Sequence, residues 1–380
     1  MIEPAVDIST ARIIAPKSDT IARLTRIWQE MLGVESISPD QNYFDLGGDS
    51  ILAVQLFIRI EQEFNVKLPL ATLFDAPTIR ELAEVLQPEA SSAGWSPLVA
   101  IQPHGTRPPF FCIHPHGGNV LIYRDLSRHL GSEQPFYGLQ CRGLDGAQPP
   151  LTRIEDMAAL YINEIRKAQR RGPYFLGGYC MGGAAAFEVA QQLQSQGEQV
   201  ALLALFDTMN WTGVSVPSLW LQSYHLGQRL TFHVTNFLSL DSGSRAAFFR
   251  EKAKTAWGRV RVWRSILRAK FTEPSPAAES DAWILGQIWR ANIRAYMDYV
   301  PQPYSGAVTD FRPVRQYRGW EGPELKWKGL AQGGEEIIVL PVNAPGMMAE
   351  PYVKHLAAAL TKSIEAAIRG YRTDPGIVQS

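Results

Sequence analysis

The segment from Tyr174 to Gly183 constrains the fold more than any other part of the sequence. It reads Tyr-Phe-Leu-Gly-Gly-Tyr-Cys-Met-Gly-Gly and leads into the alanine-rich run 184–193. The apolar start predicts a short strand, and the run that follows predicts a helix. Small residues on both sides of Cys180 allow a sharp strand-to-helix turn, which exposes a nucleophile at the end of a sheet. Cysteine takes the place that serine usually holds, and a thiol at a helix N-terminus is expected to have a lowered pKa.

The sequence after Pro97 alternates short apolar runs with longer amphipathic ones, which predicts a parallel sheet covered by helices. Residues 211–295 interrupt this rhythm with long helical, aromatic and basic stretches, so we expect a helical lid there. The predicted strands are 110–113, 136–139, 174–176, 200–206, 306–311 and 335–342, and the predicted helices include 154–168, 184–193 and a closing helix beyond Pro351.

The first part of the chain has a different pattern. Apolar residues recur at helical spacing in 21–32, 51–64 and 79–86, which predicts a small all-α bundle over residues 20–88. Residues 1–19 and 89–97 have the composition of linkers, and 373–380 that of a tail. With 380 residues the chain exceeds the usual size of one hydrophobic core, which agrees with two domains.

Composition excludes several classes of protein. No basic and apolar leader opens the chain and no apolar run is long enough to span a bilayer, so we expect a cytoplasmic protein with no membrane partner. Three cysteines without a CxxC pair argue against a disulfide framework and against a metal site.

Charge is distributed unevenly along the chain. Residues 1–90 carry 14 acidic and 7 basic groups, whereas residues 245–270 carry nine basic groups and a single acidic one. The two regions could attract each other, or the basic run could be an ordinary solvated helix face. Nucleic acid is not expected as a partner.

A second motif, Asp45-Leu-Gly-Gly-Asp-Ser50, places a serine at a predicted helix start, where a phosphodiester would lie favourably against the helix dipole. A plain helix cap is the simpler alternative. The whole string closely resembles the attachment motif of peptidyl carrier domains, which are four-helix bundles. That resemblance, over residues 20–88, implies that Ser50 carries 4'-phosphopantetheine and that a separate phosphopantetheinyl transferase adds it.

Two further elements lie where a nucleophile such as Cys180 would need them. Asp207 ends the predicted strand 200–206, where its carboxylate could orient an imidazole. The loop His114-Pro-His116-Gly-Gly could aim a backbone N–H at the same point and pair with that of Met181 as an oxyanion hole. We expect both histidines to be loop residues rather than bases, and Cys112 to be a buried structural cysteine.

Several segments together strongly resemble the type I thioesterase domains of nonribosomal peptide and polyketide synthetases. They are 109–118, 138–146, the turn at Cys180 and Leu205-Phe-Asp207. The resemblance covers residues 98–372 and implies an α/β-hydrolase fold, with Cys180 as nucleophile, Asp207 as orienting acid, and His116 and Met181 as backbone oxyanion donors. It also implies upstream adenylation and condensation modules and a carrier-bound acyl or peptidyl substrate.

The sequence departs from this family at the general base. Counting back from Glu350-Pro351 puts Ala344 where the family has its histidine. The chain is then either a variant stalled in turnover or an enzyme with another base. Two alternatives remain: a degenerate thioesterase that shelters a loaded carrier without turnover, and a free-standing esterase with an appended helical domain, against which the Ser50 motif argues.

Overall fold

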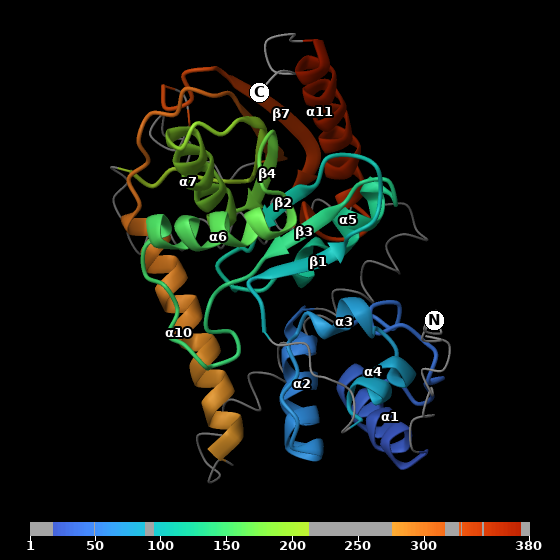
Figure 1. The fold of residues 1–380 in the computed structure, drawn as a ribbon. Helices are drawn as coiled ribbons and strands as arrows, with labels where there is room; N and C mark the ends of the chain where they lie inside the picture. The colour runs from blue at the N-terminus through green and yellow to red at the C-terminus, as the bar shows by residue number, and fades with distance from the viewer. Residues whose placement is uncertain are drawn as a thin grey trace, which may run out of the picture. The chain divides into compact units, whose positions relative to one another are not determined.

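The computed structural model describes residues 18–48, 50–87, 95–212, 276–315, 327, 329–343 and 346–373. The chain separates into two compact units, residues 1–94 and 95–380 (Figure 1). Most of the predicted lid, the basic run 245–270, and Ala344 lie outside the described residues.

The first unit contains four helices among its described residues: α1 (Ser18–Leu32), α2 (Ser50–Phe64), α3 (Thr72–Asp75) and α4 (Ile79–Val85). Fully buried side chains from all four form its core, among them Leu24, Trp28, Leu56, Ile60, Leu73 and Leu82. A capping box starts α4, since the Thr78 side chain accepts from the Glu81 N–H and the Glu81 carboxylate accepts from the Thr78 N–H.

Backbone conformation and packing explain the glycine pair Gly47-Gly48 that precedes α2. Gly47 adopts φ +85°, and a side chain at Gly48 would overlap the ring of Tyr43. Tyr43 is buried and packs edge-on against Trp28, with ring centroids 5.4 Å apart. The loop therefore lies close against the core and brings the chain into α2 at Ser50.

The second unit is built on a seven-stranded sheet in the order β1-β3-β2-β4-β5-β6-β7. Only β1 runs antiparallel to its neighbour, and all other pairs are parallel. The strands are β1 (Leu98–Gln102), β2 (Phe110–Ile113), β3 (Phe136–Leu139), β4 (Tyr174–Tyr179), β5 (Val200–Phe206), β6 (Val308–Arg315) and β7 (Glu335–Asn343). The predicted parallel sheet is thus confirmed.

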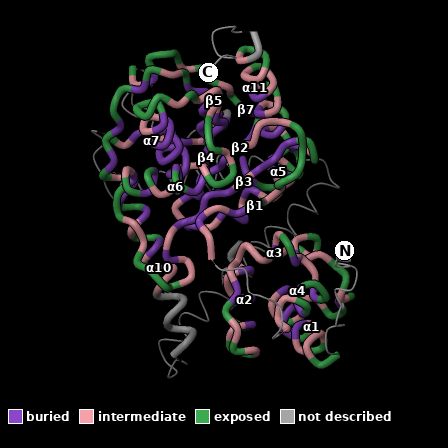
Figure 2. Tube along the Cα trace, in the orientation of Figure 1, coloured by how far each residue is buried: buried purple, intermediate pink, exposed green. Residues whose placement is uncertain are grey.

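Helices cover both faces of this sheet (Figure 1). On one face α6 (Ile154–Ala168) packs against α7 (Met181–Ser195), and on the other α5 (Arg124–Leu130) packs against α11 (Val353–Thr373). The central strands and α7 are almost wholly buried, which is the double-sided burial expected of parallel strands (Figure 2).

Helix α10 (Pro276–Asp298) includes the last residues of the predicted lid, 276–295, and contacts α7. A short 3-10 helix, Leu121–Tyr123, precedes α5. Within the described part of the chain, every helix is too short or too polar to cross a membrane.

Candidate active site

Cys180 occupies a sharp turn between β4 and α7, with φ 56° and ψ −122°. A non-glycine residue with positive φ in a tight turn is a strained position that needs support from its surroundings. Its N–H donates to the Phe206 carbonyl at 2.9 Å. Side chains at Gly178 and Gly182 would overlap backbone atoms, those of Gly182 and of Ile113 respectively. The glycines of the motif are therefore required for the turn to form.

The thiol has a raised pKa, and the expected lowering is wrong. Burial raises the pKa of Cys180 to about 11, the Met181 N–H lowers it in part, and the charge of Asp207 raises it further. Desolvation disfavours the thiolate by more than the helix N-terminus favours it. At pH 7 only about one thiol in 10⁴ would be ionised, so Cys180 needs a base to act as a nucleophile.

Asp207 directly follows β5, at the same edge of the sheet as Cys180. Its N–H donates to the Phe311 carbonyl of β6 at 2.9 Å, and its φ is 45°. Burial raises the pKa of its carboxyl to about 6. Among the described residues no side chain makes a hydrogen bond to that carboxylate. The structure thus brings Asp207 to the edge of the sheet where Cys180 lies, and no imidazole in the described part of the chain bonds to its carboxylate.

His116 lies in the loop after β2, and its ring approaches Cys180, with Nδ1 4.0 Å from the Sγ. The ring meets that of Trp289 edge-to-face, with centroids 4.0 Å apart and planes at 84°. Burial lowers the pKa of His116. The ring of His116 therefore lies at the site, whereas the sequence had led us to expect only its backbone N–H there.

His114 has a different environment from His116. It is fully buried, and its two ring nitrogens lie 2.7 Å from the Pro115 carbonyl and 2.6 Å from the Tyr161 hydroxyl. Burial lowers the pKa of His114 to about 4. It is a core residue.

Helix α10 supplies residues that the sequence analysis did not identify. Asn292 is fully buried, and its Nδ2 donates to the His116 carbonyl at 3.0 Å. The Tyr296 hydroxyl donates to the Met209 carbonyl at 2.7 Å and accepts from the Met209 N–H at 2.9 Å, which fixes the chain just beyond Asp207. Trp289, Asn292 and Tyr296 recur at helical spacing, and this shared face was the available signal.

The two expected oxyanion donors lie on adjoining segments. Met181 opens α7 next to Cys180, and its N–H points at the sulfur. The loop that holds His116 packs against the start of α7, since a side chain at Gly182 would meet the Ile113 and His114 carbonyls. No described hydrogen bond uses the His116 N–H.

The remaining site predictions lie elsewhere in the chain. Ser50 is the first residue of α2 in the other unit. Ala344 follows β7 but lies outside the described residues. Cys112 is fully buried in β2, and burial raises its pKa well above the usual range. The described residues contain no group of three His, Cys, Asp or Glu side chains placed to hold a metal ion.

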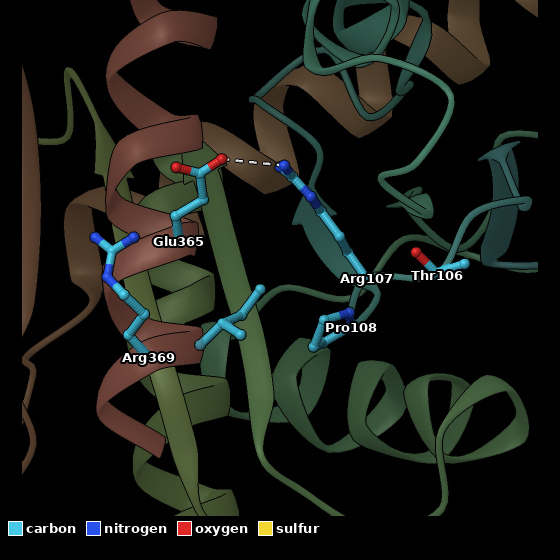
Figure 3. Close-up of a pocket in the computed structure, with 6 residues that line it drawn as sticks. Thr106, Arg107, Pro108, Glu365 and Arg369 are labelled. Atoms are coloured by element: carbon cyan, nitrogen blue, oxygen red, sulfur yellow. Dashed lines mark hydrogen bonds and ion pairs between the residues drawn. The ribbon is translucent and has the colours of Figure 1, made fainter. Parts of the chain in front are cut away.

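A shallow pocket of about 270 Å³ opens between the loop before β2 and α11 (Figure 3). There Arg107 points toward Glu365, with its Nη2 3.0 Å from the carboxylate Oε1. The pocket lies at the amino end of β2, whereas Cys180 follows the carboxyl end of the adjacent parallel strand β4. It is therefore separate from the candidate active site.

Comparison with known protein families assigns the two units. Residues 22–86 match the phosphopantetheine attachment site, and residues 108–217 match the thioesterase domain.

One relative and one solved structure match nearly the whole chain. A dimodular nonribosomal peptide synthase of Bacillus subtilis is 40% identical over 54% of the chain, and a probable non-canonical nonribosomal peptide synthetase of Salinispora arenicola is 35% identical over 97%. A solved four-domain nonribosomal peptide synthetase, bound to AMP and glycine, covers 95% of the chain with 25% identity and a TM-score of 0.56. The chain spans 9%, 5% and 27% of the lengths of these three proteins.

Proposed function

Because the chain carries a phosphopantetheine carrier domain followed by a thioesterase domain, with homologues among nonribosomal peptide synthetases, we propose that it releases an acyl chain from the carrier through Cys180. The placement of Cys180 carries the proposal, since its thiol lies at the strained turn between β4 and α7, next to the Met181 N–H that opens the helix. Release by water would be hydrolysis, and release by an internal or second acyl nucleophile would be cyclisation or condensation.

The carrier domain holds 4'-phosphopantetheine covalently, and we propose Ser50 as its attachment point. Its place as the first residue of α2 suits a phosphodiester, because unpaired N–H groups and the positive end of the dipole lie at a helix start. When bound, the group supplies a thiol that presents the acyl chain as a thioester. The carrier also implies a phosphopantetheinyl transferase and upstream modules, for which we propose adenylation and condensation domains.

Cysteine changes the energetics of the first step. Transfer of an acyl group from a thioester to serine gives an oxoester and loses much of the activation, whereas transfer to Cys180 gives another thioester and is nearly balanced. The acyl-enzyme keeps its activation for the release step. A demanding release, such as formation of a ring or a carbon–carbon bond, would benefit from this.

Release is the step that Ala344 affects. The family has its base histidine at this position, and the Asp207 carboxyl, which would orient it, has no imidazole among the described residues. We therefore propose that deacylation is slow in this chain, by about 10²–10⁴-fold, the usual effect of losing a base. The second candidate function is a sheltering module that binds a loaded carrier without turnover, and the same alanine favours it.

Replacement of Ala344 by histidine separates the two candidates. The holo-chain is loaded on its carrier, and release is followed by intact mass over time in Ala344 and Ala344→His proteins. A stalled enzyme gains turnover from the histidine, whereas a sheltering module does not. Ser50→Ala serves as the loading control, since it should gain no mass from coenzyme A and a broad phosphopantetheinyl transferase.

A further inference from the structure

We propose that the imidazole of His116 takes the proton from Cys180 when the thiol is acylated. This rests on the proposed function, because it concerns the same nucleophile, but it assigns the base of the acylation step to the loop after β2. In the related thioesterases that base is expected from the loop after β7, where this chain has Ala344.

The distance between the two groups suits a proton transfer. The His116 Nδ1 lies 4.0 Å from the Cys180 Sγ, which is the long end of a hydrogen bond to sulfur. Catalytic hydrogen bonds are often long in the absence of substrate and tighten when it binds. No other described histidine ring contacts the thiol, and both ring nitrogens of His114 already have partners.

His116 is held at its ring and at its backbone. Trp289 meets it edge-to-face at 4.0 Å, and Asn292 fixes the carbonyl of the same residue at 3.0 Å. The Cys141 Sγ lies 3.7 Å from the Asn292 Oδ1 and 3.2 Å from the Arg142 carbonyl, so its single S–H is shared between these two acceptors. Both holding residues belong to α10, so this helix orients the base as well as bordering the site.

The protonation states of the pair fit this role. Burial raises the pKa of Cys180 to about 11 and lowers the pKa of His116, so a neutral thiol faces a neutral imidazole near pH 7. A neutral imidazole with Nδ1 toward the sulfur carries its proton on Nε2 and can accept one at Nδ1. Neither residue has to be ionised before the substrate arrives.

The acylation step returns its proton to the departing thiol. The Sγ–H proton of Cys180 moves to the His116 Nδ1 while the sulfur attacks the thioester carbonyl, and the Met181 and His116 N–H groups receive the oxyanion. Collapse breaks the bond to the departing thiol, which takes the proton back from Nδ1. The products are a Cys180 thioester and a free thiol, with neutral His116 restored.

His116 and Asp207 reach Cys180 from opposite sides. β4, which leads into Cys180, lies between β2 and β5, and His116 follows β2 whereas Asp207 follows β5. Among the described residues no hydrogen bond joins the two side chains. His116 therefore supports acylation without the orienting carboxylate, which agrees with a slow release step.

The test uses p-nitrophenyl acetate, so that it depends neither on the carrier nor on the natural acyl chain. The burst of p-nitrophenolate reports acylation of the thiol and is followed by stopped flow from pH 4.5 to pH 9. The variants are His116→Gln, which cannot take up a proton, His116→Ala with and without added imidazole, and Cys180→Ala. His104→Ala, an exposed histidine in the loop before β2, is the matched control.

We expect a burst that requires Cys180. Its rate should fall at low pH, where His116 becomes protonated, below a pKa that burial has lowered from 6.5. His116→Gln should slow it by about 100-fold or more and remove that inflection, so that the rate rises steadily with pH. Imidazole should partly restore His116→Ala, and His104→Ala should match the unsubstituted chain.

An unchanged rate and pH profile in His116→Gln would overturn the inference. So would a slower burst that keeps the inflection and gains nothing from imidazole, because that pattern reports a disturbed loop. Absence of any Cys180-dependent burst in the unsubstituted chain would instead refute the proposed nucleophile, and the role of His116 with it.

Discussion

Replacement of Asp207 by asparagine should stabilise the protein at neutral pH, although the residue lies in the candidate active site. Burial raises the pKa of its carboxyl from 3.8 to about 6, and no described side chain compensates the charge. Asparagine keeps the shape without the charge. The backbone accepts it, because asparagine is among the few residues common at a φ of 45°.

The size of the stabilisation follows from the pKa shift of Asp207. About two pKa units at 1.36 kcal/mol each give an upper value of roughly 3 kcal/mol, and the partial exposure of the side chain reduces this to about 2 kcal/mol. The folded state holds the proton up to about pH 6, whereas the unfolded chain loses it near 3.8. The free energy of unfolding therefore falls as pH rises from 4 to 6, and the cost of the charge is fully present above that window.

Urea unfolding followed by tryptophan fluorescence measures the effect. The free energy of unfolding of Asp207→Asn should exceed that of the unsubstituted chain by about 2 kcal/mol at pH 7.5, and this difference should vanish near pH 4. Asp298→Asn removes an exposed carboxylate, 68% accessible, and should show no such trend. A destabilised Asp207→Asn protein at pH 7.5 would mean that the carboxylate has a partner after all and would refute the reasoning.

Further predictions concern the same unit. In a chain that carries Ala344→His, Asp207→Asn should lower the free energy of unfolding at pH 6, because the carboxylate would then have an imidazolium partner. If Asp207→Asn instead raised the free energy of unfolding equally with Ala344 and with Ala344→His, position 344 would lie away from Asp207. Gly182→Ala should lower the free energy of unfolding by more than about 2 kcal/mol, since the new side chain would overlap the Ile113 carbonyl. Gly370→Ala on α11, where nothing lies within 4 Å of the new side chain, should raise the free energy of unfolding by about 0.5–1 kcal/mol in the same urea titration. Equal midpoints for the two glycine variants would contradict the packing argument.

The sequence predicted most of the sheet because its central strands are buried on both faces and therefore appear as short continuous apolar runs. Phe110–Ile113 and Val200–Phe206 were predicted with the bounds that the structure has. β1 was missed, because an edge strand covered on one side alternates Leu98-Val-Ala-Ile-Gln102 without a clear run. The turn at Cys180 was predictable because its glycines are required locally.

The electrostatics of the site were less predictable. Motif reasoning placed Cys180 at a helix start and expected a lowered pKa, but the pKa depends on how much protein surrounds the thiol, which is a property of tertiary packing. The approach of the His116 ring depends on Trp289 and Asn292, which lie about 175 residues away in the chain. No local pattern around His114-Pro-His116 contains that information.

The central claim, transfer of the acyl chain to Cys180, is tested most directly by peptide mapping of the loaded holo-chain. The chain is primed with an acyl-coenzyme A by a phosphopantetheinyl transferase, quenched in acid, digested and analysed by mass spectrometry. The account predicts acyl mass on the Cys180 peptide in the unsubstituted chain, and on the Ser50 peptide alone in Cys180→Ala. Acyl mass that stays on Ser50 in both proteins, or release that is equally fast without Cys180, would contradict it.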